Sequence, residues 1–203
     1  MDMNIAYRYY GQKPLYLNIT NRCTNKCKFC IRYTDSGVEG TDLWLQHEPS
    51  LEEIKAALEE ADYKSCEEIV MCGYGEPMMR WDIIPEICRF IRSGNKDAKI
   101  RINTNGHGNK IAGRDITGSL EGLVDEISIS LNEKNAKKYH ELCVCDFGED
   151  GFYELLDFAK KAKNHVKKVV LSIVDVLPPD DIEECKRIAE ETGVPLRIRE
   201  MIN

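Results

Sequence analysis

Three cysteines lie within eight residues in the stretch CTNKCKFC, at Cys23, Cys27 and Cys30. Thiolate sulfur is a strong ligand for zinc and for iron. A structural zinc site normally has four protein ligands, and no fourth cysteine or histidine follows here at a short spacing. A cubane iron-sulfur cluster held by three thiolates instead keeps one iron open to a ligand from outside the protein. The spacing therefore favours an iron-sulfur cluster with one open coordination position.

Two other interpretations of this stretch stay open. Cys27 and Cys30 could join Cys143 and Cys145, far along the chain, in a zinc site. A redox dithiol is the second alternative, although it needs only two thiols. The chain has nine cysteines, and an odd number excludes a complete disulfide framework. We expect the six cysteines outside the stretch to pack as small buried hydrophobes, and the sequence assigns no role to Cys143 and Cys145.

Residues that could do chemistry need elements to position them, and six short apolar runs predict six β-strands. These runs lie at residues 14–19, 68–71, 99–104, 126–131, 168–174 and 195–199. Helical patterns alternate with them at 50–61, 81–93, 109–122, 135–142, 152–166 and 178–193. The first helix has the best-defined start, because Ser50 and Glu53 form a capping box. Such alternation predicts parallel strands joined by right-handed crossovers.

The predicted strands carry polar residues on one face and apolar residues on the other, because side chains alternate along a strand. A sheet covered by helices on both faces would be apolar throughout, so the alternation predicts a barrel with a polar chamber inside. The chain ends soon after the sixth strand, and we therefore expect a partial (β/α)6 barrel of six parallel strands with outer helices. We expect one domain over residues 1–203. The polar faces carry Tyr16, Asn18, Thr20, Arg101, Asn103, Asn105, Ser128, Ser130, Asn132, Arg197 and Arg199.

Arginines are prominent on these polar faces. Arg101, Arg197 and Arg199 would share the chamber with Asn103. A guanidinium group binds carboxylate and phosphate through two parallel hydrogen bonds, so the arginines predict a small anionic substrate. The alternative is that they fill the bottom of the barrel and pair with acidic residues.

The overall charge and hydropathy exclude several classes of partner. The formal net charge is -7, and no run of Lys and Arg is long enough to neutralise a line of phosphates, which argues against nucleic acid. No stretch reaches the roughly 18 apolar residues of a membrane span. The N-terminus lacks the basic-then-apolar order of a signal peptide. We expect a cytoplasmic protein without a membrane partner.

Taken together, these motifs resemble those of the radical S-adenosylmethionine (radical SAM) superfamily, whose core is a partial (β/α)6 barrel. The C-x-x-x-C-x-x-C loop follows the first strand, and GYGEP at 73–77 resembles the motif that holds the amino group of SAM. SISLN at 128–132 matches the position of the ribose contacts, and Phe29 matches an aromatic residue beside the adenine. The resemblance implies a [4Fe-4S] cluster on the three cysteines of the stretch. It also implies SAM contacts from Phe29, Gly73, Tyr74, Gly75, Glu76, Asn105, Ser130 and Asn132.

The resemblance further implies an oxygen-sensitive enzyme that cleaves SAM reductively to a 5'-deoxyadenosyl radical, which abstracts hydrogen from a substrate. TNG at 104–106 and YHEL at 139–142 are most similar to the short TatD-associated radical SAM proteins. That likeness implies a functional link to a TatD-family hydrolase. Cluster reduction implies an electron donor such as flavodoxin or ferredoxin. Two alternatives remain: an activase that installs a glycyl radical on a protein partner, and a non-catalytic zinc- or cluster-binding interaction module.

Overall fold

The structure is a computed structural model that describes residues 3–9, 13–33 and 40–200. Seven strands in this part of the chain form one sheet in the order β1-β2-β3-β4-β5-β6-β7. The six strands from β2 to β7 are parallel, and the short β1 pairs antiparallel with β2. The strands are β1 Ala6–Tyr7, β2 Leu15–Leu17, β3 Glu68–Met71, β4 Lys99–Thr104, β5 Glu126–Ser130, β6 Lys168–Val174 and β7 Leu196–Arg199.

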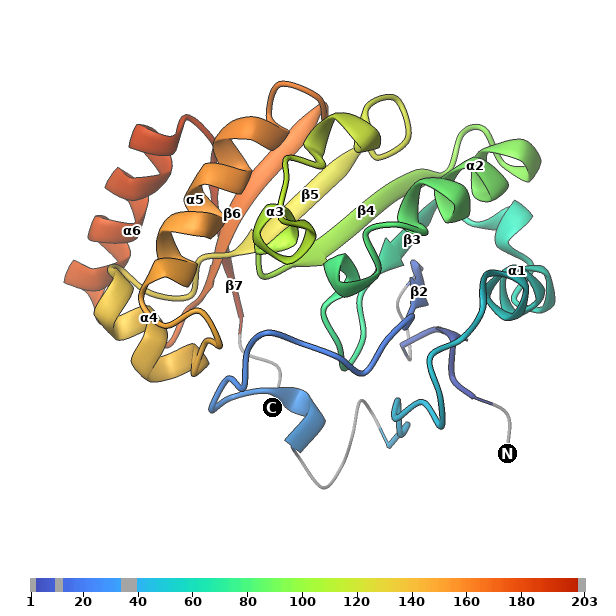
Figure 1. The fold of residues 1–203 in the computed structure, drawn as a ribbon, viewed down its shortest axis with the longest axis horizontal. Coiled ribbons are helices and arrows are strands. Elements are labelled where there is room, and N and C mark those ends of the chain that lie inside the picture. The colour runs from blue at the N-terminus through green and yellow to red at the C-terminus, as the bar shows by residue number, and fades with distance from the viewer. Residues whose placement is uncertain (1–2, 10–12, 34–39, 201–203) are drawn as a thin grey trace.

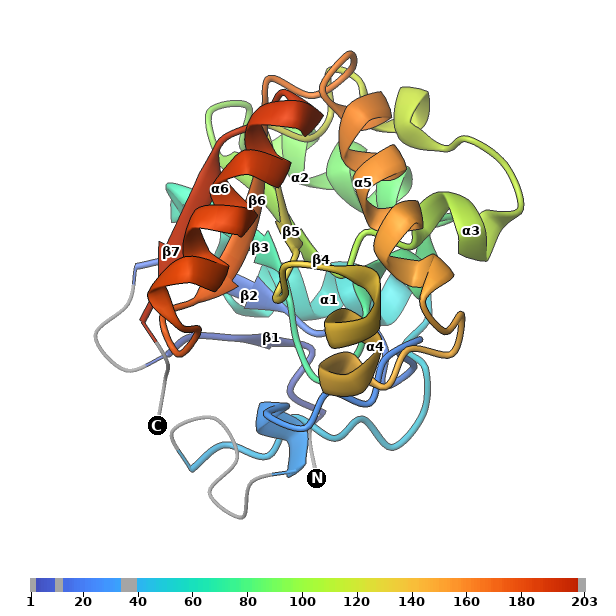
Figure 2. The ribbon, with the colours of Figure 1, turned by 90° about the vertical axis from the view of Figure 1, so that its left-hand side faces the viewer.

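The predicted partial barrel of six parallel strands is confirmed, and β1 is an addition that the sequence pattern did not predict. Within the described residues, β1 and β7 are the two edges of the sheet, so the barrel is open between them. Figures 1 and 2 show the sheet as a curved layer with the helices along its outer side.

The described part of the chain has six α-helices, most of which lie along the outer side of the sheet, while α4 lies next to α5 at the lower end of the view in Figure 1. The predicted capping box is present, since the backbone N–H of Glu53 donates to Ser50 Oγ and that of Ser50 donates to Glu53 Oε2. The predicted helix at 109–122 is wrong in its length. Gly113 has a φ of +66° and ends a first short helix, after which a 3-10 turn forms at Thr117–Leu120. The helices are α1 Leu51–Glu60, α2 Ile84–Gly94, α3 Gly108–Ala112, α4 Ala136–Cys143, α5 Asp150–Ala162 and α6 Pro179–Thr192.

The two faces of the sheet differ as the alternation predicts. The outer face is apolar and packs with the helices in one core that includes Ile100, Ile102 and Ile129. The inner face is polar over part of its area, where strand register places Asn103 beside Ser128, and Ser172 between Ser130 and Arg197. Near β2 and β3 it is apolar instead, because Tyr16 and Val70 belong to a second buried cluster. The chamber of the predicted barrel is therefore built from these inward positions.

The parallel strands also fix where the loops meet. Because the carboxyl ends of parallel strands lie at one edge of a sheet, the segments that follow β2, β3, β4, β5 and β6 gather there. This edge holds the cysteine stretch and the GYGEP segment. No helix in the residues that the structure describes is long and apolar enough to cross a membrane.

Candidate functional site

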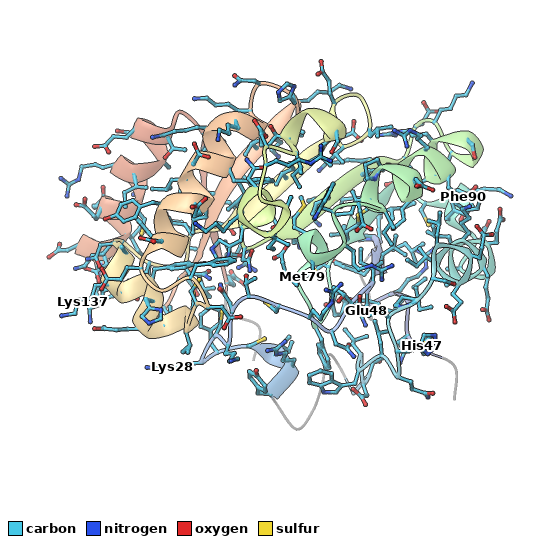
Figure 3. All side chains as sticks on the ribbon, in the orientation of Figure 1. Lys28, His47, Glu48, Met79, Phe90 and Lys137 are labelled. Carbon is cyan, nitrogen blue, oxygen red and sulfur yellow. The ribbon has the colours of Figure 1, made fainter. Side chains whose placement is uncertain are left out.

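The segment that we call the cysteine loop, residues 18–30, runs from the end of β2 to a 3-10 turn at Ile31–Tyr33. Its first part is held by Glu48, whose carboxylate accepts hydrogen bonds from the Thr20 hydroxyl and from Arg22, the latter with Nη2 at 2.6 Å (Figure 3). Burial raises the pKa of Glu48, but the hydrogen bonds from Arg22 and Thr20 outweigh it, and the net pKa is lowered. Lys28 points away from the sheet (Figure 3). The loop is thus anchored at its start.

The second part of the cysteine loop is joined to the end of α4. The N–H groups of Lys26 and Lys28 donate to the carbonyls of Cys143 and Leu142, at 2.9 and 3.0 Å. Cys27 therefore lies opposite Cys143, and a hydrogen bond between the two thiols raises the pKa of Cys27. Figures 1 and 2 both show the loop passing next to α4. The structure thus brings Cys27 to Cys143, as the zinc alternative would need.

The donor set of the loop suits a cluster better than a single ion. All nine cysteines are free, and Cys23, Cys27 and Cys30 are each partly exposed. Burial raises the pKa of Cys30, while the backbone N–H and the charge of Arg32 lower it. The Arg32 guanidinium therefore lies near the predicted ligand Cys30. Nowhere in the described residues do three His, Cys, Asp or Glu side chains converge on one ion position. A cubane does not require such convergence, because each thiolate binds its own iron.

Most of the other cysteines are buried, as predicted. Cys66, Cys88, Cys143, Cys145 and Cys185 are buried, and Cys72 is the exception, being only partly buried. Cys72 follows β3 on the inner side of the sheet, where its thiol receives a hydrogen bond from Asn103.

The glycine loop, residues 72–76, lies directly against the start of the cysteine loop. A β-carbon at position 73 would overlap the Asn18 carboxamide, and one at position 75 would overlap the backbone carbonyl of Thr20. At position 75 two backbones approach closely, which only glycine permits, and at position 73 the backbone approaches the Asn18 side chain. The two predicted glycine contacts, Gly73 and Gly75, are therefore needed to bring the loops together, whatever else they bind. Tyr74, between them, is buried and packs against Trp44 with ring centroids 5.4 Å apart.

Glu76 closes the glycine loop and is almost fully buried. Its Oε1 accepts from Thr104 Oγ1 at 2.6 Å and from Met78 N–H at 2.9 Å, and its Oε2 accepts from Asn105 N–H at 2.6 Å. Burial raises its pKa to about 7, against the effect of these hydrogen bonds. Glu76 therefore caps the 3-10 turn Pro77–Arg80 and ties the glycine loop to the end of β4. Its role toward the amine of SAM stays a prediction.

A cavity of about 190 Å³ lies between the cysteine loop, α4 and the end of β6, and its lining is almost entirely apolar. Phe29 and Asn132, both predicted SAM contacts, lie on its walls. The Asn132 Oδ1 atom is buried without a hydrogen-bond partner, so it is available to a ligand. Ser130, two residues earlier, is half-buried. The lining residues are Phe29, Asn132, Leu142, Val174, Val176 and Leu177.

Sequence patterns missed part of this cavity. Leu142 and Leu177 come from the end of α4 and from the segment after β6, and nothing in their local sequence marks them as lining residues.

The arginines of the chamber divide into two kinds. Arg197 pairs with Glu126, which is fully buried and also contacts two lysines. Arg101 Nε lies 3.2 Å from Glu68 Oε1. The interpretation that these arginines pair with acids is therefore confirmed for Arg101 and Arg197. Arg199 forms no ion pair with an acid among the described residues.

The surroundings of Arg199 leave its charge uncompensated. Partial burial of the guanidinium lowers its pKa, as do the nearby charges of Arg197 and Arg101, although the residue as a whole is exposed to solvent. In the sheet it pairs in register with Val174, which lines the cavity. Asn103, on the same inner face, has a buried Oδ1 atom without a partner. Arg199, without an acidic partner in the described residues, and Asn103 thus have polar groups that could bind a substrate. Within the same part of the chain Arg101 Nε also makes no hydrogen bond, although it lies beside Glu68.

Comparisons with known proteins agree with this geometry. The family model described as Radical SAM superfamily matches residues 17–192. A radical SAM methyltransferase from Sphaerobacter thermophilus has a TM-score of 0.67 at 16% identity, over 98% of this chain and 69% of that chain. The FeFe-hydrogenase maturase HydG from Carboxydothermus hydrogenoformans has a TM-score of 0.67 at 17% identity, over 94% and 44%.

A third solved structure is Streptococcus suis SuiB bound to S-adenosylmethionine, with a TM-score of 0.63 at 18% identity, over 93% of this chain and 38% of that chain. The chain therefore spans about two thirds of the methyltransferase and less than half of the other two proteins. At these identities the likeness shows the fold. No curated protein matches the sequence.

Proposed function

We propose a function from the premise that this chain belongs to the radical SAM superfamily. It is an enzyme of that superfamily, and its cofactors are a [4Fe-4S] cluster and SAM. When bound and reduced, these cofactors supply cleavage of SAM to methionine and a 5'-deoxyadenosyl radical. The proposal concerns which residues hold the cofactors and what kind of molecule the radical meets.

We assign the cluster to Cys23, Cys27 and Cys30. The observation that carries this assignment is the position of the cavity, because Phe29 of the cysteine loop forms one of its walls. A ligand in the cavity would lie next to the three thiols. The charge of Arg32 beside Cys30 would stabilise the anionic thiolates.

We assign the adenosine of SAM to the cavity. Phe29, Val174 and Val176 offer apolar contacts to a planar base, and the free Oδ1 of Asn132 can accept a hydrogen bond from a ribose hydroxyl. The glycine loop would face the methionine part, where backbone groups can approach closely. The protein's own contribution is to bind and orient SAM and to exclude water from it.

The test is anaerobic reconstitution of the chain with iron and sulfide, followed by reduction with SAM present. We expect 5'-deoxyadenosine and methionine in equal amounts. A protein that contains a full [4Fe-4S] cluster and yet releases no 5'-deoxyadenosine would contradict the proposed function. It would favour the alternative of a non-catalytic cluster-binding module.

The substrate that we propose is a small anion bound at Arg199 and Asn103. Arg101 and Arg197, the other two residues of the predicted substrate set, pair with acids instead. The guanidinium of Arg199 supports this, because Arg199 is exposed to solvent and forms no ion pair with an acid among the described residues, which leaves it able to bind a ligand of opposite charge. The register of Arg199 with Val174 puts it beside the wall that we assign to adenosine.

Replacing Arg199 by glutamine should abolish anion binding in the chamber. We expect inorganic phosphate or malonate, at ten times its dissociation constant, to stabilise the wild-type chain by about 1.4 kcal/mol, which raises Tm by roughly 3–6 °C. Arg199→Gln should lose this shift in a thermal unfolding assay. The matched control is Arg114→Gln, because Arg114 stacks over Trp81 away from the chamber. Equal shifts in both variants would argue against the anion site.

Several finer assignments belong to the same proposal. The likeness of TNG and YHEL supports the TatD-associated subgroup and a link to a TatD-family hydrolase in the cytoplasm. A flavodoxin or ferredoxin would supply the electron. The glycyl-radical activase remains the second candidate, because the sheet is open between β1 and β7 in the described residues and a protein segment could enter there. Co-purification of a protein that acquires a radical would favour it.

A further inference from the structure

A network of buried polar side chains connects the cysteine loop with the segment after β4. Thr24 and Asn25 lie between the first two predicted cluster ligands, and each is less than a tenth exposed. Their partners are Asn105 and His107 after β4 and Tyr139 on α4, all of them also buried. The Asn25 carboxamide donates to the Tyr139 hydroxyl at 3.0 Å, which in turn lies 3.2 Å from His107 Nε2. None of these contacts is needed to explain the cavity or the chamber.

The direction of the hydrogen bonds in this network follows from one backbone carbonyl, which can only accept. His107 Nε2 lies 3.0 Å from the carbonyl oxygen of Gly151, so Nε2 carries the proton. Burial lowers the pKa of His107 to about 4, which keeps the ring neutral. The other ring nitrogen, Nδ1, is then an acceptor, and the Thr24 hydroxyl donates a hydrogen bond to it at 2.9 Å.

The Thr24 oxygen, whose hydroxyl hydrogen points to His107, can still accept a hydrogen bond through its lone pairs. It receives a hydrogen bond from Asn105 Nδ2 at 2.8 Å. The other end of the same carboxamide is also fixed, because Asn105 Oδ1 accepts a hydrogen bond from the backbone N–H of His107 at 3.1 Å. The orientation of the Asn105 side chain is therefore determined at both ends.

This orientation directs the amide of Asn105 at a cluster ligand. Asn105 Nδ2 lies 3.9 Å from Cys23 Sγ, within reach of a hydrogen bond to sulfur, and the Asn25 N–H lies 3.4 Å from the same atom. Both polar ends of the Asn105 carboxamide have protein partners. The predicted contact of Asn105 with SAM stays a prediction, and the geometry gives this residue a different task.

We propose that Asn105 is a positioning residue that, held by Thr24 and His107, donates a hydrogen bond to the Cys23 sulfur and raises the reduction potential of the cluster. The inference rests on the proposed function, because it takes Cys23 as a ligand. A donor to a ligand sulfur stabilises the more negative, reduced cluster, so it makes reduction easier. The hydrogen bonds to Thr24 and from the His107 backbone keep this donor in place.

The test is a redox titration of the reconstituted holoprotein, followed by electron paramagnetic resonance of the reduced cluster. Asn105→Leu should lower the equilibrium constant for reduction roughly tenfold, which is about 59 mV for a one-electron couple. Thr24→Val should shift the potential in the same direction by a smaller amount. Thr24→Ser keeps the hydroxyl and should restore the wild-type potential.

The matched control is Asn109→Ala. Asn109 is also a buried asparagine, and its Oδ1 accepts from the Ile116 N–H at 2.9 Å, but no hydrogen bond joins it to the cysteine loop among the described residues. This variant should lose stability without a change of potential. Proton electron-nuclear double resonance gives a second readout: Asn105→Leu should lose one exchangeable proton coupled to the cluster, while the coupling from the backbone N–H of Asn25 stays.

Each outcome decides between the inference and the proposed function. A wild-type potential in an Asn105→Leu protein with full iron content would overturn the inference and leave the proposed function standing. If Asn105→Leu fails to assemble a cluster, an unchanged reduction potential in Thr24→Val would overturn the inference instead. A wild-type chain that binds no iron would overturn the proposed function, and the inference with it.

Discussion

Replacing Cys23, Cys27 and Cys30 together by alanine should abolish both the cluster and the cleavage of SAM. Cluster thiolates are supplied by cysteine alone in the proposed site, and the removal of all three leaves no ligand in the loop. Iron and sulfide content, the visible absorption of the cluster and its electron paramagnetic resonance signal measure assembly. Release of 5'-deoxyadenosine measures cleavage. We expect a complete loss of all four readouts, at unchanged secondary structure.

The controls for this prediction are cysteines that lie elsewhere. Cys88 and Cys185 are fully buried in the outer core, so Cys88→Ala and Cys185→Ala should keep the cluster, at a cost in stability of about 1 kcal/mol from the lost packing. Cys143→Ala is the informative variant, because its thiol contacts that of Cys27. If the triple variant retains iron while addition of Cys143→Ala removes it, the cluster or zinc site belongs to the other cysteines.

Replacing Gly75 by alanine should destabilise the protein and prevent SAM binding. A β-carbon there would lie 2.7 Å from the carbonyl carbon of Thr20 and 2.8 Å from the carbonyl oxygen of Arg22. Both atoms belong to the backbone, so no side-chain rotation can relieve the overlap. We expect a loss of about 3 kcal/mol in the free energy of unfolding, measured by urea denaturation of the cluster-free chain. In the loaded enzyme, SAM binding measured by equilibrium dialysis should fall below detection.

Gly118→Ala is the matched control for this substitution. The nearest atom to a β-carbon at position 118 would be His165 Cε1 at 3.7 Å, which is ordinary van der Waals contact. Its stability should stay within about 0.5 kcal/mol of the wild type. A Gly75→Ala protein that matches this control in stability and in SAM binding would show that the two loops separate without cost.

Local sequence patterns gave the framework of the fold. Three of the predicted strands, at 68–71, 99–104 and 168–174, coincide with the observed ones, because alternation of apolar and polar side chains is a property of neighbouring residues. The start of α1 was predictable for the same reason, since a capping box lies within four residues. The two-residue strand β1 was not, because its pairing with β2 joins residues that are about ten positions apart.

The candidate site shows the same division. The spacing of the three cysteines lies within a single loop and is visible in the sequence. The partners of Glu76 are not, since Thr104 and Asn105 are 28 and 29 residues away. The pairing of Arg197 with Glu126 spans 71 residues. Which arginines have an acidic partner depends on contacts between strands that are far apart in the sequence. The sequence therefore did not distinguish Arg101 and Arg197, which are paired, from Arg199.

Residue types and their spacing are enough to predict the class of fold, the three thiols with their missing fourth ligand, and the glycine loop that follows β3. These features depend on residue type and on spacing along the chain. The tertiary structure alone decided which charges are neutralised, where an apolar cavity opens beside Phe29, and how Asn105 is held against Cys23. Burial and hydrogen-bond direction depend on contacts between segments that fold together, and no local pattern records them.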